Sequence, residues 1–579
     1  MPAPQWLVSD VNPQAARDLA AALSIQPLTA RVLLSRGFRD PETARKFLAP
    51  SLDHLHDPFL LTGMRDAVAR LRSAIEAKQK ILIYGDYDVD GTVSIVILKK
   101  AIELAGGDAV FHVPHRLKEG YGMRSEVIER AADAGVNLIV SVDTGIRAQE
   151  VVRGARERGI DVIITDHHLP DAELPPALAV LNPNRRDCPY PDKNLCGAGV
   201  AFKLVQALLA TLPWPKDRLT RMLQSFLKLV AVATVADVVP LVGENRVIVK
   251  YGLDGLRRVT NPGLRALLEV SGLLNGRAPS ARQIAFQIAP RINAAGRMDD
   301  ANDVIRMFLA DDDGEARALA GQLHALNQDR QETEAEIVRL VLEECASVPV
   351  TEDQTALVFA GPQWHRGVVG IVASRLVERF CRPVFVLSEE DGEAQGSGRS
   401  IAQFHLLEAL ESMPDLFSRF GGHRQAAGLS MRADLVPEFR RRLNAYTGAR
   451  LTPADFRPQL VIDAVAGLKE LTTGPAVEEL LGLAPFGFGN PAPVLTVEGA
   501  QVAAAPALFK DKHLRVHLRQ DGRSFTATAW NAAERAGELC SGAVVDAAFS
   551  LEEDRYAESR GWPGWSAVLR DFRPCGPSE

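Results

Sequence analysis

KILIYGDYDVDG, residues 80–91, is an apolar run that ends in three carboxylates at alternate positions, Asp86, Asp88 and Asp90. The apolar half is typical of a buried parallel strand, and residues 92–104 carry apolar side chains at helical spacing. In open α/β sheets the crevice at the carboxyl end of a strand holds ligands. Closely spaced carboxylates repel one another and are costly to bury without a partner, so the stretch predicts a divalent cation at a strand end.

Two other interpretations of the acidic stretch stay open at this point. The pattern D-x-D-x-D-G also begins a calcium-binding EF-hand loop, but the twelfth position, where that loop needs a bidentate glutamate, is Ile97. The second alternative is a solvated acidic turn after a strand. The rest of the chain has to decide between that turn and a metal site.

Length and composition describe an ordinary globular protein of several domains. The chain has 579 residues, 46% of them apolar and 24% charged, with a net charge of -7. A polyanion would therefore have to be held by local basic clusters. The six cysteines show no C-x-x-C spacing, which argues against a zinc knuckle or a disulfide framework. No signal peptide and no membrane span are expected, and the predicted location is the cytoplasm.

Strand and helix patterns alternate from about residue 65 to 250, which predicts a parallel sheet with helices on both faces. The next strands are expected at 109–114, 137–142 and 160–165. Asp143 follows the second of these, and His167 and His168 follow the third. Because the carboxyl ends of parallel strands share one edge of a sheet, these groups should lie near the first acidic stretch.

These strand ends together predict a site for two divalent cations. One aspartate or histidine after a strand is a weak signal, because it more often caps a helix or makes a hydrogen bond. The combined set supplies enough oxygen and nitrogen ligands for two ions that share a carboxylate. Asp237, which follows an apolar segment at 226–235, is a further candidate ligand.

Several longer motifs resemble those of a known family. DYDVDG (86–91), SVDTG (141–145), TDHH (165–168) and ATVADVVPL (233–241) look like the successive motifs of the DHH phosphoesterase superfamily. Five further motifs resemble those of the RecJ branch of that superfamily: PRINAAGRM (290–298), WHRGVVGIVASR (364–375), GSGRS (396–400), GGHRQAAG (421–428) and PFGFGNP (485–491). The resemblance runs from about residue 50 to beyond 520.

The remaining patterns and the resemblance together predict a multidomain α/β protein. Residues 315–346 should form one long helix, and residues 396–399 a flexible loop in a second α/β domain. Short strands after about 455 suggest a small barrel, which the resemblance implies is an OB-fold. The predicted units are a helical lead-in at 1–50, a doubly wound parallel-sheet DHH domain at 51–300, a connecting helix at 301–349, a DHHA1 domain at 350–452, and an OB-like, nucleic-acid-binding β-barrel at 453–579.

The resemblance implies a 5′→3′ exonuclease that hydrolyses single-stranded DNA to 5′-mononucleotides, in DNA recombination and repair. It implies two divalent cations, Mn²⁺ in preference to Mg²⁺, with Asp143 bridging them and His168 contacting phosphate or supporting the ligands. The expected metal ligands are Asp86, Asp88, Asp90, Asp143, His167 and Asp237. Expected partners are single-stranded DNA, a single-stranded-DNA-binding protein and a helicase, and the enzyme is expected to act as a monomer.

Substrate contacts are expected from both α/β domains. Arg116, Ser397 and Arg399 are the candidates for holding a 5′ phosphate, because arginine gives oriented, charge-assisted contacts. Tyr121 and Trp364 are candidates for stacking on bases, and either could instead be a core residue. The other expected contacts are Arg291, Asn293, Arg297, His365 and His423. For these, ordinary surface or structural roles remain open.

Three other functions are compatible with parts of the sequence. A sibling phosphodiesterase acting on oligoribonucleotides, cyclic dinucleotides or pyrophosphate would share the metal ligands but would not need the C-terminal β domain. A non-catalytic DNA-binding scaffold should lack several metal ligands, and all are present here. A dinucleotide-binding enzyme would need G-x-G-x-x-G after the first strand, where this chain has GDYDVDG.

Overall fold

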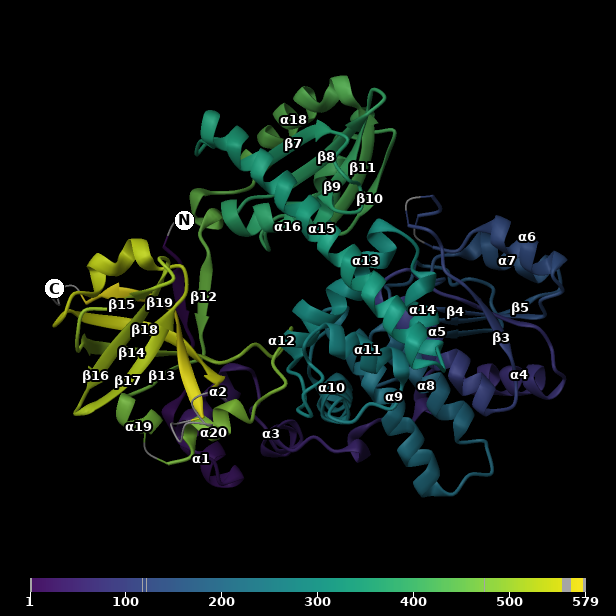
Figure 1. The fold of residues 1–579 in the computed structure, drawn as a ribbon, viewed down its shortest axis with the longest axis horizontal. Coiled ribbons are helices and arrows are strands. Elements are labelled where there is room, and N and C mark those ends of the chain that lie inside the picture. Colours follow the sequence, from purple (N-terminus) through teal and green to yellow (C-terminus); the bar gives the residue numbers. More distant parts are fainter. Residues whose placement is uncertain (1–2, 117, 121, 473, 555–563, 576–579) are drawn as a thin grey trace.

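The computed structural model describes residues 3–116, 118–120, 122–472, 474–554 and 564–575, so the predicted contact Tyr121 lies outside the described residues. Figure 1 shows a parallel-sheet domain on the right, a second α/β domain above, and a C-terminal β domain on the left. A long helix joins the two α/β domains. The predicted multidomain α/β class is confirmed.

The parallel-sheet domain contains five strands in the order β3-β2-β4-β5-β6, and every neighbouring pair is parallel. The strands are β2 (Ile81–Tyr84), β3 (Ala109–His112), β4 (Leu138–Val142), β5 (Asp161–Thr165) and β6 (Ala179–Leu181). The first four match the apolar runs in the sequence. Their carboxyl ends therefore share one edge of the sheet, as predicted.

Two hydrophobic cores cover the two faces of this sheet. Ile81 and Ile83 contribute to one core, and the alternate residues Leu82 and Tyr84 contribute to the other. The first core is completed by α4 (Met64–Glu76), α5 (Val89–Leu104) and α8 (Gly197–Leu209), and the second by α6 (Ser125–Asp133) and α7 (Gln149–Glu157). Burial on both faces explains why the strands read as continuous apolar runs.

A helical region continues the first core. It consists of α9 (Lys216–Ala236), α10 (Gly243–Gly255), α11 (Pro262–Val270), α12 (Ala281–Gln283), a π-helical turn (Ile284–Ile288), α13 (Ala289–Met298) and α14 (Asn302–Leu309). Among the described helices, α9 alone is long and apolar enough to cross a membrane, but half of its apolar window is buried inside the protein. Helix α9 therefore serves as a core helix of the domain.

Helix α15 (Asp313–Ser347) forms the predicted long connection and has 35 residues. Its first half packs against α11, α13 and α14, and its second half contacts α16 of the next domain. Ile337 and Val341 belong to the core of that next domain. The helix is therefore packed at both ends.

The second α/β domain has a mixed sheet in the order β10-β11-β9-β8-β7, in which only β7 and β8 are parallel. Its elements are β7 (Leu357–Pro362), α16 (Val369–Phe380), β8 (Val384–Glu390), β9 (Glu393–Arg399), α17 (Leu406–Glu411), β10 (Arg419–Gly422), β11 (Ala426–Arg432) and α18 (Val436–Gly448).

The predicted flexible loop at 396–399 is wrong, because these residues form the end of β9, between β8 and β11. The glycines there are needed for close packing. A Cβ on Gly396 would lie 2.0 Å from the carbonyl oxygen of Val386, and one on Gly398 would lie 2.4 Å from the Phe385 ring. Ser397 and Arg399 are thus presented by a strand in the middle of a sheet.

The C-terminal domain is a closed barrel. Strands β14 (Val494–Val502), β18 (Val544–Glu553), β19 (Trp565–Pro574), β17 (Arg523–Ala529) and β16 (His513–Gln520) pair in that order, and a β14–β16 pairing closes the ring. The short elements β12 (Gln459–Ile462), β13 (Ala464–Val465), α19 (Leu468–Thr472), α20 (Ala476–Leu481) and β15 (Ala507–Phe509) complete the domain. The predicted OB-like barrel is confirmed.

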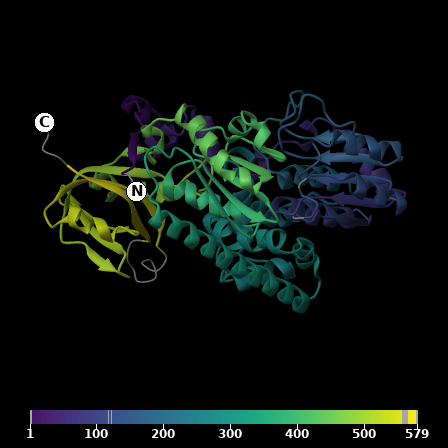
Figure 2. The same cartoon turned by 90° about the horizontal axis from the view of Figure 1, so that it is seen from above.

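The N-terminal segment packs against this barrel domain (Figures 1 and 2). Strand β1 (Gln5–Val8) pairs with β12, and the Trp6 indole nitrogen donates a hydrogen bond to Asp571 at 2.6 Å. Helices α1 (Pro13–Leu23), α2 (Pro27–Ser35) and α3 (Pro41–Leu48) share a core with α20 and the barrel strands. The expected helical lead-in thus also contributes a strand.

Candidate metal centre and phosphate site

The acidic residues after β2 are fixed by the start of α5. Asp88 is the N-cap of α5, because its side chain accepts a hydrogen bond from the Gly91 amide at 3.0 Å. Asp86 and Asp90 are buried on either side of it. Ile97 is buried inside α5, so the position that an EF-hand would give to a glutamate cannot reach a cation.

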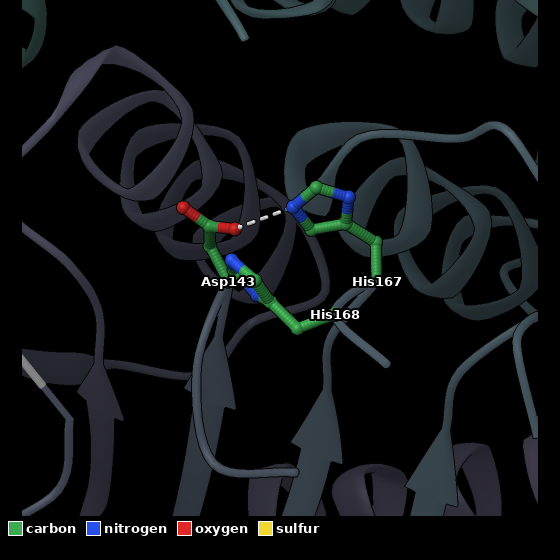
Figure 3. Close-up of side chains that lie close together, drawn as sticks. All are labelled: Asp143, His167 and His168. Atoms are coloured by element: carbon green, nitrogen blue, oxygen red, sulfur yellow. Dashed lines mark ion pairs between the residues drawn. The ribbon is translucent and has the colours of Figure 1, made fainter. Parts of the chain in front are cut away.

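The strand ends bring the predicted ligands together, as Figure 3 shows for Asp143, His167 and His168. The His167 Nε2 atom lies 3.3 Å from Asp143 Oδ1, 3.7 Å from Asp237 Oδ2 and 3.8 Å from Asp90 Oδ2. Ligand atoms lie within 4.8 Å of one another in three groups: Asp86, Asp88 and Asp143; Asp90, His167 and Asp237; and Asp143, His167 and His168. Asp143 and His167 each belong to two groups, and of these two Asp143 is the carboxylate, the kind of ligand that can bridge two cations.

Burial and mutual repulsion disturb the ionisation of these carboxylates. The pKa of Asp86 and that of Asp143 are raised well above the usual range, first by burial and then by the negative charges of Asp88 and Asp90, respectively. The pKa of Asp88 is raised by burial and by Asp90. Burial and Asp90 together raise the pKa of Asp237 to about 9. A bound cation would offset both causes, because its positive charge stabilises the ionised form of each carboxylate.

The donor set fits divalent cations. Among the described residues, Asp86 Oδ1, Asp237 Oδ2 and His167 Nε2 are buried atoms without a hydrogen-bond partner. Burial lowers the pKa of His167, so its imidazole is neutral near pH 7 and able to coordinate a metal. A mixture of carboxylate and imidazole ligands suits Mn²⁺ and Mg²⁺ better than Ca²⁺.

Two positioning residues were missed by the sequence reasoning. Asp166, fully buried, accepts hydrogen bonds from the His167 and His168 amides and pairs with His168 Nδ1 at 2.7 Å. Burial alone would lower the pKa of His168, but this pairing with Asp166 raises it overall. The signal was available, because Asp166 begins the D-H-H triplet.

Gly197 is the second missed residue. The amides of Gly197 and Ala198, at the start of α8, donate to the two oxygens of Asp90 at 2.6 and 2.8 Å. A Cβ on Gly197 would lie 2.5 Å from Asp143 Oδ1. This glycine therefore lets a helix N-terminus fit between two carboxylates, and the sequence signal was the small-residue run CGAG at 196–199.

Three predicted phosphate contacts form a cluster of positive charge beside the carboxylates. The pKa of Arg297 is lowered to about 10 by burial and by the charges of Arg116 and Arg399, and the pKa of Arg399 is lowered by burial and by Arg116. Among the described residues, none of the three forms an ion pair with a carboxylate, although Arg116 and Arg297 interact electrostatically with Asp86 and Asp88, respectively. We call Arg116, Arg297 and Arg399 the arginine cluster. The three guanidinium groups repel one another, and an anion bound between them would offset that repulsion.

Both α/β domains build this cluster. Arg297, on α13, donates to the Gly367 carbonyl oxygen of the second domain at 3.2 Å. Arg116 lies over the Tyr87 ring at 4.9 Å, beside the acidic stretch. Arg399 comes from β9, and a Cβ on Gly370 would lie within 3.5 Å of both its guanidinium and the Ser397 hydroxyl.

Two of the other predicted contacts on α13 have protein partners. Asn293 Oδ1 accepts a hydrogen bond from the Val89 amide at 3.2 Å, so it braces the start of α5. Arg291 donates to the Gln287 carbonyl oxygen and to His324 Nδ1 on α15. The structure thus places Arg291 at the α13–α15 contact.

The predicted contacts in the second domain differ in exposure. Trp364 covers Gly361 and packs on that domain's core, and His365 Nδ1 accepts a hydrogen bond from the Gly367 amide at 3.2 Å. His423 is exposed after β10, and its pKa is lowered by burial and by Arg147 and His168. It lines a cavity of about 650 Å³ together with His168, Arg147 and Met123. His423 thus faces the metal centre from the opposite domain.

An acidic centre at the carboxyl edge of a parallel sheet, with an arginine cluster shared with a second α/β domain, defines a metal-dependent phosphoesterase of the DHH class. Family models match residues 80–234 (DHH family, N-terminal domain), 353–449 (DHHA1 domain) and 462–562 (RecJ OB domain). The chain belongs to the RecJ family of single-stranded-DNA-specific exonucleases.

Curated relatives and solved structures give the extent of this similarity. The RecJ of Dickeya dadantii is 41% identical over 513 residues, which cover 86% of this chain and 88% of the relative. The RecJ of Bacillus subtilis is 39% identical over 550 residues, covering 94% and 68%. The crystal structure of Thermus thermophilus RecJ with Mn²⁺ aligns with a TM-score of 0.81 at 33% identity, covering 99% of this chain and 80% of that one. The same protein has also been solved with Mg²⁺.

Proposed function

We propose that this protein hydrolyses single-stranded DNA from the 5′ end and releases 5′-mononucleotides. The observation that carries the proposal is the pairing of an acidic centre with an arginine cluster at one edge of the same sheet. The acidic centre suits cations that would bind a scissile phosphate, and the arginine cluster suits a second, terminal phosphate. An exonuclease that measures one nucleotide from a phosphorylated end needs both sites.

The metal ligands we propose are Asp86, Asp88, Asp90, Asp143, His167 and Asp237, with Asp143 shared between two ions. Mn²⁺ is the proposed physiological ion and Mg²⁺ the weaker alternative. When bound, the cations would offset the charge of the scissile phosphate and acidify a water molecule for attack on phosphorus. His168, whose pKa is raised by Asp166, would donate a hydrogen bond to a phosphate oxygen.

The chain's own residues would provide orientation. Arg116, Arg399 and Ser397 would hold the 5′ phosphate, with Arg297 supplying further positive charge. Because Arg399 comes from the second domain and Arg116 from the first, a 5′ phosphate would join the two domains. The barrel domain is proposed to hold the single strand downstream. Trp364 and His423 are proposed contacts to the strand between these points.

The cellular setting is proposed from the same function. A cytoplasmic monomer would receive single strands from a helicase or from a single-stranded-DNA-binding protein during recombination and repair. Its local basic groups have to act against the net charge of -7, which favours substrates delivered by such partners.

End-labelled oligonucleotides test the proposal. Single-stranded and duplex DNA, labelled at the 5′ or the 3′ end, would be digested with Mn²⁺, Mg²⁺ or a chelator. The expected result is immediate release of 5′-labelled mononucleotide from the single strand, gradual shortening of the 3′-labelled strand, and no product with chelator. Release of 3′-terminal nucleotides first would contradict the polarity.

The Arg399→Ala variant tests the end-binding site. Loss of charge-assisted hydrogen bonds, each worth about 1.5–3 kcal/mol, should lower kcat/KM on 5′-phosphorylated strands by about 10- to 100-fold. The loss on 5′-hydroxyl strands should be much smaller. Arg432→Ala is the matched control, because Arg432 is exposed in the same domain and pairs with Asp434. Equal losses on both substrates would show that Arg399 does not bind the 5′ phosphate.

A further inference from the structure

The motif PFGFGNP, residues 485–491, lies in the C-terminal domain but contacts the segment that follows Asp237. The Leu241 amide donates a hydrogen bond to the Phe488 carbonyl oxygen at 2.8 Å. Gly489 has φ +71, and a Cβ there would lie 2.7 Å from the Pro240 Cβ and 2.9 Å from its Cα. The approach is close enough that only glycine fits at position 489 without movement.

Within this motif residues 487–490 form a turn, in which Gly487 and Asn490 exchange backbone hydrogen bonds. Buried polar contacts hold the turn in place. The Asn490 side chain, 1% exposed, donates to the carbonyl oxygens of Leu483 and Pro485 and accepts from the Arg36 guanidinium at 2.6 Å. The buried Arg246 guanidinium of α10 donates to the carbonyl oxygens of Leu483 and Ala484. Contacts from the N-terminal segment and from the parallel-sheet domain thus fix the turn from two sides.

The segment that the turn contacts is strained. Val238, directly after Asp237, has φ +59 and is 60% exposed. A left-handed conformation is unfavourable for a β-branched residue and costs about 1–3 kcal/mol, so the surrounding structure has to impose it. Within the parallel-sheet domain, the Asn245 side chain holds the Pro240 carbonyl oxygen at 3.0 Å. The C-terminal domain adds the Phe488 hydrogen bond and the Gly489 contact.

We propose that the turn at residues 487–490 is a positioning element for Asp237, so that docking of the C-terminal domain sets the affinity of the cation site. Asp237 is the C-cap of α9, and its backbone amide is anchored to Ala233. The turn contacts Pro240 and Leu241, three and four residues after Asp237, and so restrains the chain that leaves Asp237. This inference rests on the proposed role of Asp237 as a metal ligand.

The test is Gly489→Ala in the full chain, with Gly522→Ala as the matched control. Gly522 has φ +73, and a Cβ there would meet nothing within 4 Å, so both variants carry the same backbone strain. Only Gly489→Ala forces Pro240 away. Supporting groups around metal ligands are worth about 10- to 100-fold in metal affinity. We expect a loss of that size in Mn²⁺ affinity by calorimetric titration for Gly489→Ala, and none for the control.

Two further readouts separate positioning from general damage. Binding of a 5′-phosphorylated dinucleotide in chelator should be unchanged, because so short a strand depends on the arginine cluster and not on the barrel domain. The kcat of Gly489→Ala should return to near the wild-type value at saturating Mn²⁺. Wild-type Mn²⁺ affinity in Gly489→Ala would overturn the proposal, and so would a parallel loss of DNA binding without metal.

A second pair of variants covers the case in which Gly489→Ala does not fold. A Cβ on Gly487 would lie 2.6 Å from Leu241 Cδ1, a movable side-chain atom. Gly487→Ala should weaken Mn²⁺ binding by a few-fold, and adding Leu241→Val, which removes Cδ1, should restore it. Failure of the double variant to regain affinity would count against the proposal.

Asp237→Ala distinguishes failure of this inference from failure of the proposed function. If Asp237→Ala keeps wild-type Mn²⁺ affinity, Asp237 is not a ligand and the proposed metal site is wrong. If Asp237→Ala loses affinity but Gly489→Ala matches its control, the metal site stands and only the positioning role fails.

Discussion

The acidic centre and the arginine cluster are both sets of like charges, but they are assembled in different ways. All the predicted metal ligands come from the parallel-sheet domain, at the ends of β2, β4, β5 and α9. The arginine cluster joins Arg116 and Arg297 of that domain with Arg399 of β9. One domain can therefore build the cation site, whereas the anion site exists only when the two α/β domains are docked.

The two sites also differ in how repulsion between their like charges is relieved when no ligand is bound. Carboxylates can take up protons and so become neutral, and the raised pKa values of Asp86, Asp143 and Asp237 show that protonation is favoured there. Arginines stay protonated at any physiological pH, so the charge that the nearby Asp86 and Asp88 do not offset has to be balanced by solvent or by a bound anion. Metal loading should consequently respond to pH much more than phosphate binding does.

The largest effect is expected from Asp143→Ala. This variant removes the carboxylate shared by two ligand groups, and with it several kcal/mol of charge stabilisation at the scissile phosphate. Hydrolysis should fall by about 10³-fold or more with either Mn²⁺ or Mg²⁺, measured by mononucleotide release. Binding of 5′-phosphorylated strands in chelator should persist, since the arginine cluster is intact. Activity within tenfold of wild type would show that Asp143 is not the shared ligand.

A buried pair of opposite charges provides the contrast to both like-charged sets. Lys203 and Glu244 are fully buried and form an ion pair, which Tyr190 and the His56 backbone complete by hydrogen bonds. Lys203→Met would leave the buried Glu244 side chain without its cationic partner. The free energy of unfolding should fall by about 3–5 kcal/mol, measured by denaturant titration.

In the absence of metal, Asp143→Asn should not lower the free energy of unfolding as Lys203→Met does. Asp143 has φ +59, a conformation that asparagine also adopts, and the change replaces a buried carboxyl group that is costly to ionise with a neutral amide. In chelator its midpoint of unfolding should equal or exceed that of wild type. Asp143→Asn as destabilising as Lys203→Met would mean that the carboxylates support the fold in some other way than as metal ligands.

The same contrast explains what the sequence could reveal. Parallel strands buried on both faces are continuous apolar runs, so β2, β4 and β5 could be predicted, and the shared edge then placed Asp86, Asp143 and His167 together. Arg399 was predicted as a phosphate contact in a flexible loop, whereas it lies at the end of strand β9. Gly396 and Gly398 suggested a flexible loop, but glycine is required at both positions because β8 packs closely against them. Glycine patterns alone do not distinguish a loose loop from a close contact.

Long-range pairing was the other limit. Nothing local in residues 5–8 indicates that they form a strand, because β1 exists only by pairing with β12, which lies in the C-terminal domain. Asn293 illustrates the same limit at a side chain. Its place beside two arginines suggested a phosphate contact, but the fold puts its oxygen on the Val89 amide. Partners distant in sequence decide both cases.

The smallest predicted effect is the pH dependence of metal stabilisation. Asp237 has a pKa of about 9 in the folded protein and an ordinary value of 3.8 when unfolded. Between these values the folded state holds a proton that the unfolded state releases, so stability without metal should decrease as pH rises from about 4 to 9. Cations compete with that proton, and their stabilising effect should therefore increase over the same interval.

Thermal unfolding with chelator or Mn²⁺ at pH 6, 7.5 and 9 would measure this effect. The increase in Tm caused by Mn²⁺ should grow by at least about 2 °C between pH 6 and 9, the size expected for roughly 1 kcal/mol in a domain of this length. Asp237→Asn should reduce the pH dependence without removing it, because Asp237 can no longer titrate while Asp86 and Asp143 still can. Between pH 7.5 and 9 the stabilisation by a 5′-phosphorylated strand in chelator should change little, since the arginines stay protonated and the terminal phosphate is already dianionic. A Mn²⁺ effect that does not change between pH 6 and 9 would show that the carboxylates are already ionised without metal, and that burial raises their pKa values less than expected.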